Sequence, residues 1–313
     1  MTTYAIRRIL YTIPVLLVAS FIIFFLLHLA PGDPAFLLVG PEGSDAQIEA
    51  TRERLGLDQP IPVQYVQYMG RLFRGDLGRS FYYKEDIMTL ILGAMPATLE
   101  LSFLALSLAL VVAIPAGVLS ALRRNTWLDH INMGVAVVAR SIPVFWLGIM
   151  LIYLFAVGLD WLPASGRAGP VWMADGRKHL VLPVISLGTV MMASTTRLTR
   201  AAMLEVLQED YMRTARAKGM RERNVIFVHG LRNALIPVVT NVGLQVGSLL
   251  GGSFLTETVF AWPGIGRLSV GAMLFRDYPV IQATMLMVVF FFVVVNLLVD
   301  LLYGVLDPRI SYQ

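Results

Sequence analysis

The segment DYMRTARAKGMRERNVIFVHGLRNALIP, residues Asp210–Pro237, is a polar, cation-rich stretch between two long apolar stretches. Between Arg197 and Arg232 the chain has eight Lys or Arg residues against four acidic residues. In membrane proteins, positive charge beside apolar spans is concentrated on the cytoplasmic side. The sequence therefore predicts a cytoplasmic loop over residues 197–232.

The composition is that of a membrane protein. Of 313 residues, 57% are hydrophobic and only 15% are charged, which is too apolar for a solvated globular surface. The absence of cysteine excludes disulfides, thiolate zinc sites and a cysteine nucleophile. Four scattered histidines show no metal-ligand spacing, so no metal site is expected. The net charge of +4 comes without a basic aromatic motif, and we attribute it to membrane topology rather than to nucleic-acid binding.

The rest of the chain predicts an all-α polytopic membrane protein with six transmembrane helices. A helix needs about 20 apolar residues to cross a bilayer. Six segments are long enough, and the fourth of them, Leu180–Thr196, is the shortest and contains Pro183 and Gly188. With the N-terminus inside, the tails and loops other than the long first loop place 13 cations inside and 5 outside, so we expect both termini to be cytoplasmic. The six segments are Ile9–Leu29, Thr98–Leu122, Ile131–Leu159, Leu180–Thr196, Ala234–Thr256 and Val280–Tyr303.

Three parts follow from these spans: residues 1–30 form the N-terminal tail and first helix, residues 31–96 an extracytoplasmic helical loop, and residues 97–313 the transmembrane core. Arg7 and Arg8 precede an apolar run that resembles a secretory signal. The run is too long for a signal and no small-residue cleavage site follows, so we interpret it as an uncleaved first helix.

The first loop has its own helix signals. Ser44 and Gln47 form a capping-box pattern before DAQIEATRERL, which ends at Gly56. Pro62 opens a second pattern, VQYVQYMGRLF, which ends at Gly75. Short amphipathic helices of this kind typically lie along a membrane surface or a partner protein rather than forming a catalytic domain.

The cytoplasmic loop itself predicts a helix, a glycine corner and a second helix. Asp210 can cap the helix YMRTARAK, Lys218 complements its C-terminal dipole, and Gly219 supplies the left-handed residue that ends it.

The second helix begins in MRERNVIFVHG, where Val225, Phe227 and Val228 are available for burial. Ala215 and Ala217 lie near the corner, where small side chains let another protein approach closely. The alternative is an ordinary solvated loop whose cations only anchor the topology.

The sequence YMRTARAKG followed by HGLRNALIPVVT resembles the "EAA" coupling loop of type I ABC importer permeases, in the dipeptide, oligopeptide, glutathione and nickel branch. Arg213 and Thr214 stand where the motif name places Glu and Ala, and Pro237 lies later than the general spacing; both departures are features of this branch. The resemblance covers essentially the whole chain. Its other motifs are APGDP (Ala30–Pro34), GDLGRS (Gly75–Ser80), ETVFAWPGIGRL (Glu257–Leu268), RDYPVIQ (Arg276–Gln282) and NLLVDLLYGVLDPRI (Asn296–Ile310).

The resemblance implies that the short helix docks into a groove of a cytosolic ATPase subunit. It also implies two such ATPase subunits, a second homologous permease subunit in a heterodimer, an extracytoplasmic substrate-binding protein, and a bacterial inner-membrane location. The sequence has no G-x-x-x-x-G-K-[ST] phosphate loop, so ATP and Mg would bind to partner subunits and no cofactor to this chain. The implied coupling residues are Asp210, Tyr211, Arg213, Thr214, Ala215, Arg216, Ala217, Lys218 and Gly219.

Gly243, Gly247 and Gly251 recur every four residues and share one face of the fifth span, which predicts close helix packing. Packing within this subunit and packing against a second permease subunit are equally compatible with the pattern.

Charged residues within the apolar spans need partners or water, because a charge in hydrocarbon costs at least about 2.5–3.5 kcal/mol. Arg140 in the third span and Asp300 in the sixth lie at comparable depths, and we hypothesise that they pair. Glu100, near the outer end of the second span, and Glu257, after the fifth, either line a water-filled path or lie solvated at the interface.

The segment Ala261–Gly266 is too short and too broken to span a membrane. Its residues Trp262, Pro263 and Gly264 suit an interfacial or re-entrant element, and a simple external turn is the alternative. The resemblance implies that this region helps to form the outer gate.

A translocation subunit without covalent chemistry is the function that these features favour. An ion-coupled secondary transporter would need buried ionisable relays and commonly shows inverted repeats. An intramembrane enzyme would need a nucleophile with a base or paired aspartates, which the sequence does not suggest. Dipeptide, oligopeptide, glutathione and nickel importers share the motifs above, and the long first loop with GPEGSDAQ leans towards the dipeptide or glutathione type.

Overall fold

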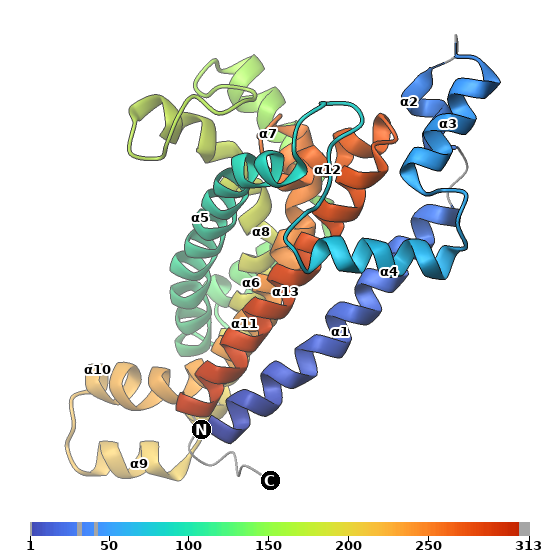
Figure 1. Cartoon of the computed structure of the whole chain (residues 1–313). Coiled ribbons are helices and arrows are strands. Elements are labelled where there is room, and N and C mark those ends of the chain that lie inside the picture. Colours follow the sequence, from blue (N-terminus) through green and yellow to red (C-terminus); the bar gives the residue numbers. More distant parts are fainter. Residues whose placement is uncertain (1, 30–32, 41–42, 307–313) are drawn as a thin grey trace.

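The computed structural model describes residues 2–29, 33–40 and 43–306, and these are mostly helical without a β-strand (Figure 1). Five helices are long and apolar enough to cross a membrane, and the number rises to six if one bent helix pair is a single span. This agrees with the six predicted spans. Four of the five lie within α1 (Thr2–Leu29), α5 (Ile87–Leu122), α8 (Ala174–Val206) and α13 (Tyr278–Leu306), and the other runs from Glu222 to Gly247, a residue inside α11 (Arg232–Val259).

The predicted third span, Ile131–Leu159, is not one continuous helix. Helix α6 (Trp127–Ser141) and the segment formed by α7 (Val144–Leu151) and the π-helical η1 (Ile152–Gly158) meet at 102°. Pro143 explains the break, because proline lacks an N–H and pushes the preceding residue out of the helical region. Ile142 accordingly has φ −83° and ψ 126°.

The second span begins earlier than predicted. The Asp86 carboxylate caps α5 by accepting a hydrogen bond from the Met88 N–H, so the helix starts at Ile87 instead of Thr98. Pro96 lies within the helix, and the loop that was expected to extend to residue 96 ends ten residues earlier.

The predicted fourth span, the weakest by sequence, lies at the centre of the molecule. Helix α8 packs along α5, α11 and α6, and small residues allow the closest approaches. A Cβ on Gly188 would lie 2.9 Å from the Ala105 carbonyl oxygen, and one on Gly117 would lie 2.7 Å from the Thr196 carbonyl oxygen. Helix α1 lies at the edge of the bundle, against α13 (Figure 1).

Three short helices follow α1: α2 (Pro34–Val39), α3 (Asp45–Leu55) and α4 (Ile61–Leu72). The predicted capping box at Ser44 and Gln47 is present, and Gly56 ends α3 in the left-handed region. Helix α4 crosses α1, where the Tyr65 hydroxyl hydrogen-bonds the Ser20 hydroxyl at 2.9 Å. Helix α4 therefore packs on the first span of the same chain, and the predicted contact of these short helices with a membrane surface or a partner protein stays a prediction.

The ends of the bundle are distinct. The start of α1 and the end of α13 lie at the same end as α9 (Asp210–Ala217), α10 (Glu222–Asn224) and the π-helical η2 (Val225–Leu231). The short helix α12 (Ile265–Leu274) and helices α2 and α3 lie at the opposite end (Figure 1).

Candidate coupling and gating sites

The predicted helix–glycine–helix arrangement is present at the end of the bundle that carries the chain's most cationic segment. Helix α9 covers Asp210–Ala217, Lys218 is its C-cap, and Gly219 has φ 75°. The predicted capping role of Asp210 is wrong, because the helix begins at Asp210 and its N-cap is Glu209, without a side-chain cap bond. Asp210 instead forms an ion pair with Arg213 at 3.5 Å, one turn later.

One side of α9 is buried against the second helix. Met212 and Ala215 pack with Val225 of η2 and with the last residues of α8. Ala215 was expected at the accessible corner; the expectation is wrong, because α9 turns this residue inward, whereas Ala217 is exposed. In the second helix, Phe227 and Val228 were expected to be available for burial, but their side chains are 51% and 54% exposed.

Polar contacts fix the two helices of this hairpin to each other. The Arg216 guanidinium donates to the Glu222 carboxylate at 3.0 Å across the Gly219 corner. The Asn233 amide donates to the Tyr211 hydroxyl at 3.0 Å, which connects α9 to the start of α11. The hairpin is therefore braced in two places besides its apolar core.

The outward face of α9 is left uncovered by the residues that the structure describes. Arg213 is 74% exposed at the side chain, and Thr214, Ala217 and Lys218 are exposed too. No heavy atom lies within 4 Å of the position a Cβ would occupy on Gly219. The hairpin thus presents a cationic surface with an open corner, joined directly to α8 on one side and to η2 and α11 on the other.

At the opposite end, Glu257 organises the segment between α11 and α12. Its carboxylate is fully buried and accepts hydrogen bonds from the Thr98 hydroxyl at 2.7 Å and the Arg267 N–H at 3.1 Å. A Cβ on Gly264 would lie 2.4 Å from this carboxylate, so only glycine fits there without displacement. Glu257 is thus held by protein groups, and its role in a water-filled path stays a prediction.

Trp262 anchors the same segment. Its side chain is fully buried and its indole N–H donates to the Ala97 carbonyl oxygen of α5 at 2.8 Å. The Ile265 N–H also donates to α5, to the Thr98 hydroxyl at 2.8 Å. Pro263, next to Trp262, is exposed. The segment is therefore packed into the bundle, as a re-entrant element would be, rather than forming a simple external turn.

The Glu100 carboxylate is also held by hydrogen bonds from a distant part of the chain. It accepts from the Arg167 guanidinium at 2.7 Å and from the Val171 N–H at 2.9 Å, both in the loop before α8. Arg167 also lies over the Trp262 ring, at 5.8 Å from its centroid. Glu100 therefore fixes an outer loop next to the Trp262 segment, and its role in a path likewise stays a prediction.

Two buried carboxylates with clear roles were missed by sequence reasoning. Asp277, before α13, accepts from the Ser80 hydroxyl at 2.5 Å and from the N–H groups of Phe81 and Tyr82 at 3.1 and 3.0 Å. Asp129 of α6 accepts from the Arg200 guanidinium of α8 at 2.6 and 2.7 Å. Asp277 lies within the quoted motif RDYPVIQ, whereas no sequence spacing connects Asp129 with Arg200, 71 residues later.

The glycine face of α11 packs within this subunit at two of its three positions. A Cβ on Gly243 would lie 2.2 Å from Val299, and one on Gly247 would lie 2.5 Å from Phe292, both on α13. Gly251 is exposed and has open space around it. The observed neighbour of the first two glycines is therefore α13.

The proposed Arg140–Asp300 pair stays a prediction. The Asp300 side chain lies outside the described part of the structure, and the Arg140 side chain is exposed. Helix α6 packs mainly on α8 and α5, whereas α13 packs on α1, α11, α12 and α5.

Comparisons with known proteins agree with this architecture. A chain of the MetNI methionine ABC transporter in an inward facing conformation superimposes with a TM-score of 0.59 and 19% identity, over 71% of this chain and 98% of that chain. A dipeptide transport system permease protein of Alkalihalophilus pseudofirmus (strain ATCC BAA-2126 / JCM 17055 / OF4) is 46% identical, and a glutathione transport system permease protein of Escherichia coli (strain K12) is 45% identical; each alignment covers both chains in full.

Two family descriptions match the sequence. Residues 1–102 match the N-terminal family of binding-protein-dependent transport system membrane components. Residues 113–312, well over half of the chain, match the family described as "Binding-protein-dependent transport system inner membrane component". With full-length relatives at 45–46% identity, the chain belongs to this family of ABC importer permeases, which are multi-pass proteins of the inner membrane.

Proposed function

We propose that this chain is a permease subunit of an ATP-driven importer for small peptides, with dipeptides and glutathione as the leading substrates. The named substrates of the full-length relatives support this choice. A soluble binding protein would deliver the peptide to the outer face, and a second, homologous permease subunit would complete the path. Both termini and the α9 hairpin would then face the cytoplasm, in agreement with the distribution of cations.

The observation that carries the proposal is the α9 hairpin. Its outward face is exposed and cationic, and its inward face is joined to α8 and α11 by an apolar core and two polar contacts. A rigid hairpin of this kind can transmit a push from a cytosolic protein to the bundle. We assign this role to two ATPase subunits that bind ATP and Mg, since the sequence has no phosphate loop of its own.

Arg213 allows a direct test, because it is exposed and, among the described residues, its one ion pair is the surface contact with Asp210. Substitution at Gly219 would confound loss of ATPase contact with backbone strain, since φ 75° strains any residue with a Cβ. Reversal of the charge in Arg213→Glu should leave membrane abundance unchanged, reduce co-purification of the ATPase subunits, and lower uptake of a labelled dipeptide at least about tenfold, the equivalent of 1.4 kcal/mol.

The matched control is Arg177→Glu, which reverses an exposed charge at the first turns of α8, far along that helix from the hairpin. Competition by unlabelled glutathione, tripeptides and nickel would rank the substrates. The coupling role is wrong if Arg213→Glu retains normal uptake and normal ATPase association. The peptide assignment is wrong if cells with all subunits take up none of the peptides in a manner that depends on this chain.

A further inference from the structure

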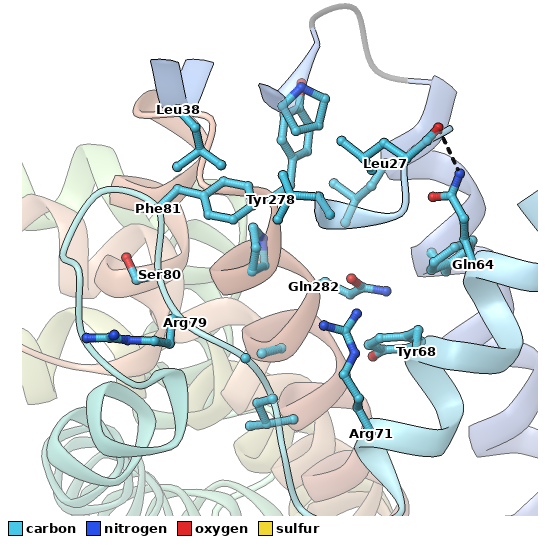
Figure 2. Close-up of a pocket in the computed structure, with 18 of the residues that line it drawn as sticks. Leu27, Leu38, Gln64, Tyr68, Arg71, Arg79, Ser80, Phe81, Tyr278 and Gln282 are labelled. Atoms are coloured by element: carbon cyan, nitrogen blue, oxygen red, sulfur yellow. Dashed lines mark hydrogen bonds between the residues drawn. The ribbon is translucent and has the colours of Figure 1, made fainter. Parts of the chain in front are cut away.

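A cavity of about 780 Å³ lies between the N-terminal helices and the core (Figure 2). Helices α2 and α3, which contribute to its walls, lie at the end of the molecule opposite the α9 hairpin (Figure 1). The walls of the cavity come from the outer end of α1, from α2, α3 and α4, from the loop over residues 76–84, and from the first turns of α13. The residues discussed above for coupling and gating are absent from its lining, apart from Ser80 and Phe81. The cavity therefore calls for an explanation of its own.

Two buried polar groups in this cavity have no partner among the described residues. These are the Tyr68 hydroxyl of α4 and the Gln282 side-chain nitrogen of α13. A buried donor without an acceptor costs free energy, so such groups commonly mark an absent ligand or water. In Figure 2 the Arg71 guanidinium lies beside both of them. Among the described residues this guanidinium has no ion pair or hydrogen bond, whereas the Arg71 carbonyl oxygen accepts from the Arg74 and Asp76 N–H groups.

The protonation state of Tyr68 suits a donor. Burial raises the pKa of its hydroxyl to about 12, with Tyr65 adding to the effect and Arg71 opposing it. The hydroxyl thus keeps its proton at any physiological pH. Tyr68, Gln282 and Arg71 together present a hydroxyl, an amide and a guanidinium from two facing helices, a set that matches an acceptor with several oxygen atoms.

The charge of the lining favours an anion. The lining includes five cationic residues and only two carboxylates, and both carboxylates already have partners. Asp33 pairs with Arg52, and Asp76 accepts from the Gly78 N–H at 2.8 Å. Apolar residues such as Phe24 and Leu27 complete the wall and strengthen the field of the cations. The cationic lining residues are Arg52, Arg54, Arg71, Arg79 and Lys84.

The position of α4 indicates where the anion comes from. Gln64 and Arg71 face the cavity, whereas Val66 and Phe73, on the other side of the helix, are 68% and 79% exposed. This apolar side adjoins the exposed apolar surface of α1, because Tyr65 of α4 packs edge-on against Phe21 of α1. A helix with one face on hydrocarbon and the other on polar groups lies at the headgroup level of a bilayer.

We propose that the cavity between α1, α4 and α13 binds an oxyanion, the phosphate group of an outer-leaflet phospholipid, through Arg71, Tyr68 and Gln282. Bound lipid would fasten the N-terminal helices to the core, because its phosphate would contact both α4 and α13 across the cavity that separates them. The proposal is independent of the transported substrate. The carboxylate of a small peptide is the other source of the same chemistry, and the experiment separates the two.

The test uses the full-length chain with its partner subunits in maltoside detergent, titrated with dihexanoylphosphatidylglycerol below its micellar concentration. Dialanine and inorganic phosphate are titrated in parallel. We expect saturable lipid binding that weakens about tenfold or more in Arg71→Gln, since a charge-assisted contact is lost. Tyr68→Phe should weaken binding by a smaller factor, because it removes one neutral hydrogen bond.

Arg74→Gln is the matched control, as it removes an exposed charge three residues from Arg71 and outside the cavity lining. The proposal is overturned if the lipid does not saturate, if Arg74→Gln weakens binding as much as Arg71→Gln, or if dialanine binds in an Arg71-dependent manner and the lipid does not. A thermal midpoint is measured for each variant; if Arg71→Gln does not fold, Gln282→Met decides by the same criteria.

Discussion

Replacing Glu257 with alanine should release the outer segment from the bundle. The Glu257 carboxylate is fully buried and accepts from the Thr98 hydroxyl and the Arg267 N–H. The substitution leaves the buried Thr98 hydroxyl without this acceptor, at about 1–3 kcal/mol, and removes the acceptor of the partly buried Arg267 N–H as well. The empty volume left by the side chain adds to this loss. Glu257→Gln keeps one acceptor oxygen and should cost about half as much.

The chain has no cysteine, so a single introduced thiol can report on this segment. Ala272 of α12 is fully buried, and Ala272→Cys should react slowly with a water-soluble maleimide. With Glu257→Ala added, we expect faster labelling and a thermal midpoint lower by several degrees, because even 1 kcal/mol shifts the midpoint of a large domain by about 2 °C.

Glu85→Ala serves as the control, since this exposed glutamate lies on the same side and its side chain makes no hydrogen bond or ion pair in the described structure. If Glu257→Ala matches Glu85→Ala in both labelling rate and thermal midpoint, Glu257 does not hold the segment.

Two further buried carboxylates allow separate tests. Asp277→Ala removes the acceptor of three donors in the loop over residues 80–82, so trypsin should cleave faster after the exposed Arg79 and Lys84. Asp76→Ala, which loses only a local turn contact, is the control. Equal cleavage of the two variants would show that Asp277 does not hold this loop. For Asp129 and Arg200, removal of either partner should cost about 3–5 kcal/mol, whereas Asp129→Leu with Arg200→Met should recover most of the loss. Strictly additive losses in thermal midpoint would show that the two side chains do not act as a pair.

The sequence predicts those features of this fold that depend on residues near one another in the chain. Apolar length indicated the number of spans, and the Ser44 capping box and the left-handed Gly56 and Gly219 were recognised because their chemistry is local. The break at Pro143 had a local signal too, yet the apolar run around it was long enough to pass as one helix.

Contacts between distant residues could not be predicted in the same way. Ala215 and Phe227 were assigned to the wrong environments because burial in the hairpin depends on how two helices face each other across Gly219. The Thr98 partner of Glu257, the Arg167 partner of Glu100 and the Ser80 partner of Asp277 lie 67 to 197 residues away in the chain. Hydropathy identifies a costly buried charge but contains no information about which donor satisfies it.

Helix α8, which precedes the α9 hairpin, and α11, which follows it, differ in the features that allow a helix to bend. We expect this difference to decide how a push from the proposed ATPase subunits would travel from the hairpin into the bundle. Between η2 and α11 the backbone passes from π-helical to α-helical geometry and then meets Pro237, features that interrupt regular helical hydrogen bonding and allow bending. Helix α8 has its only proline at Pro183, far from the hairpin, and is tied to α6 by the Asp129–Arg200 pair. Under the coupling role proposed for α9, we therefore expect a push on this helix to travel mainly through α8, with the start of α11 acting as a joint. For this reason, loss of the Asp129–Arg200 pair should impair uptake even in variants whose thermal midpoint has been recovered.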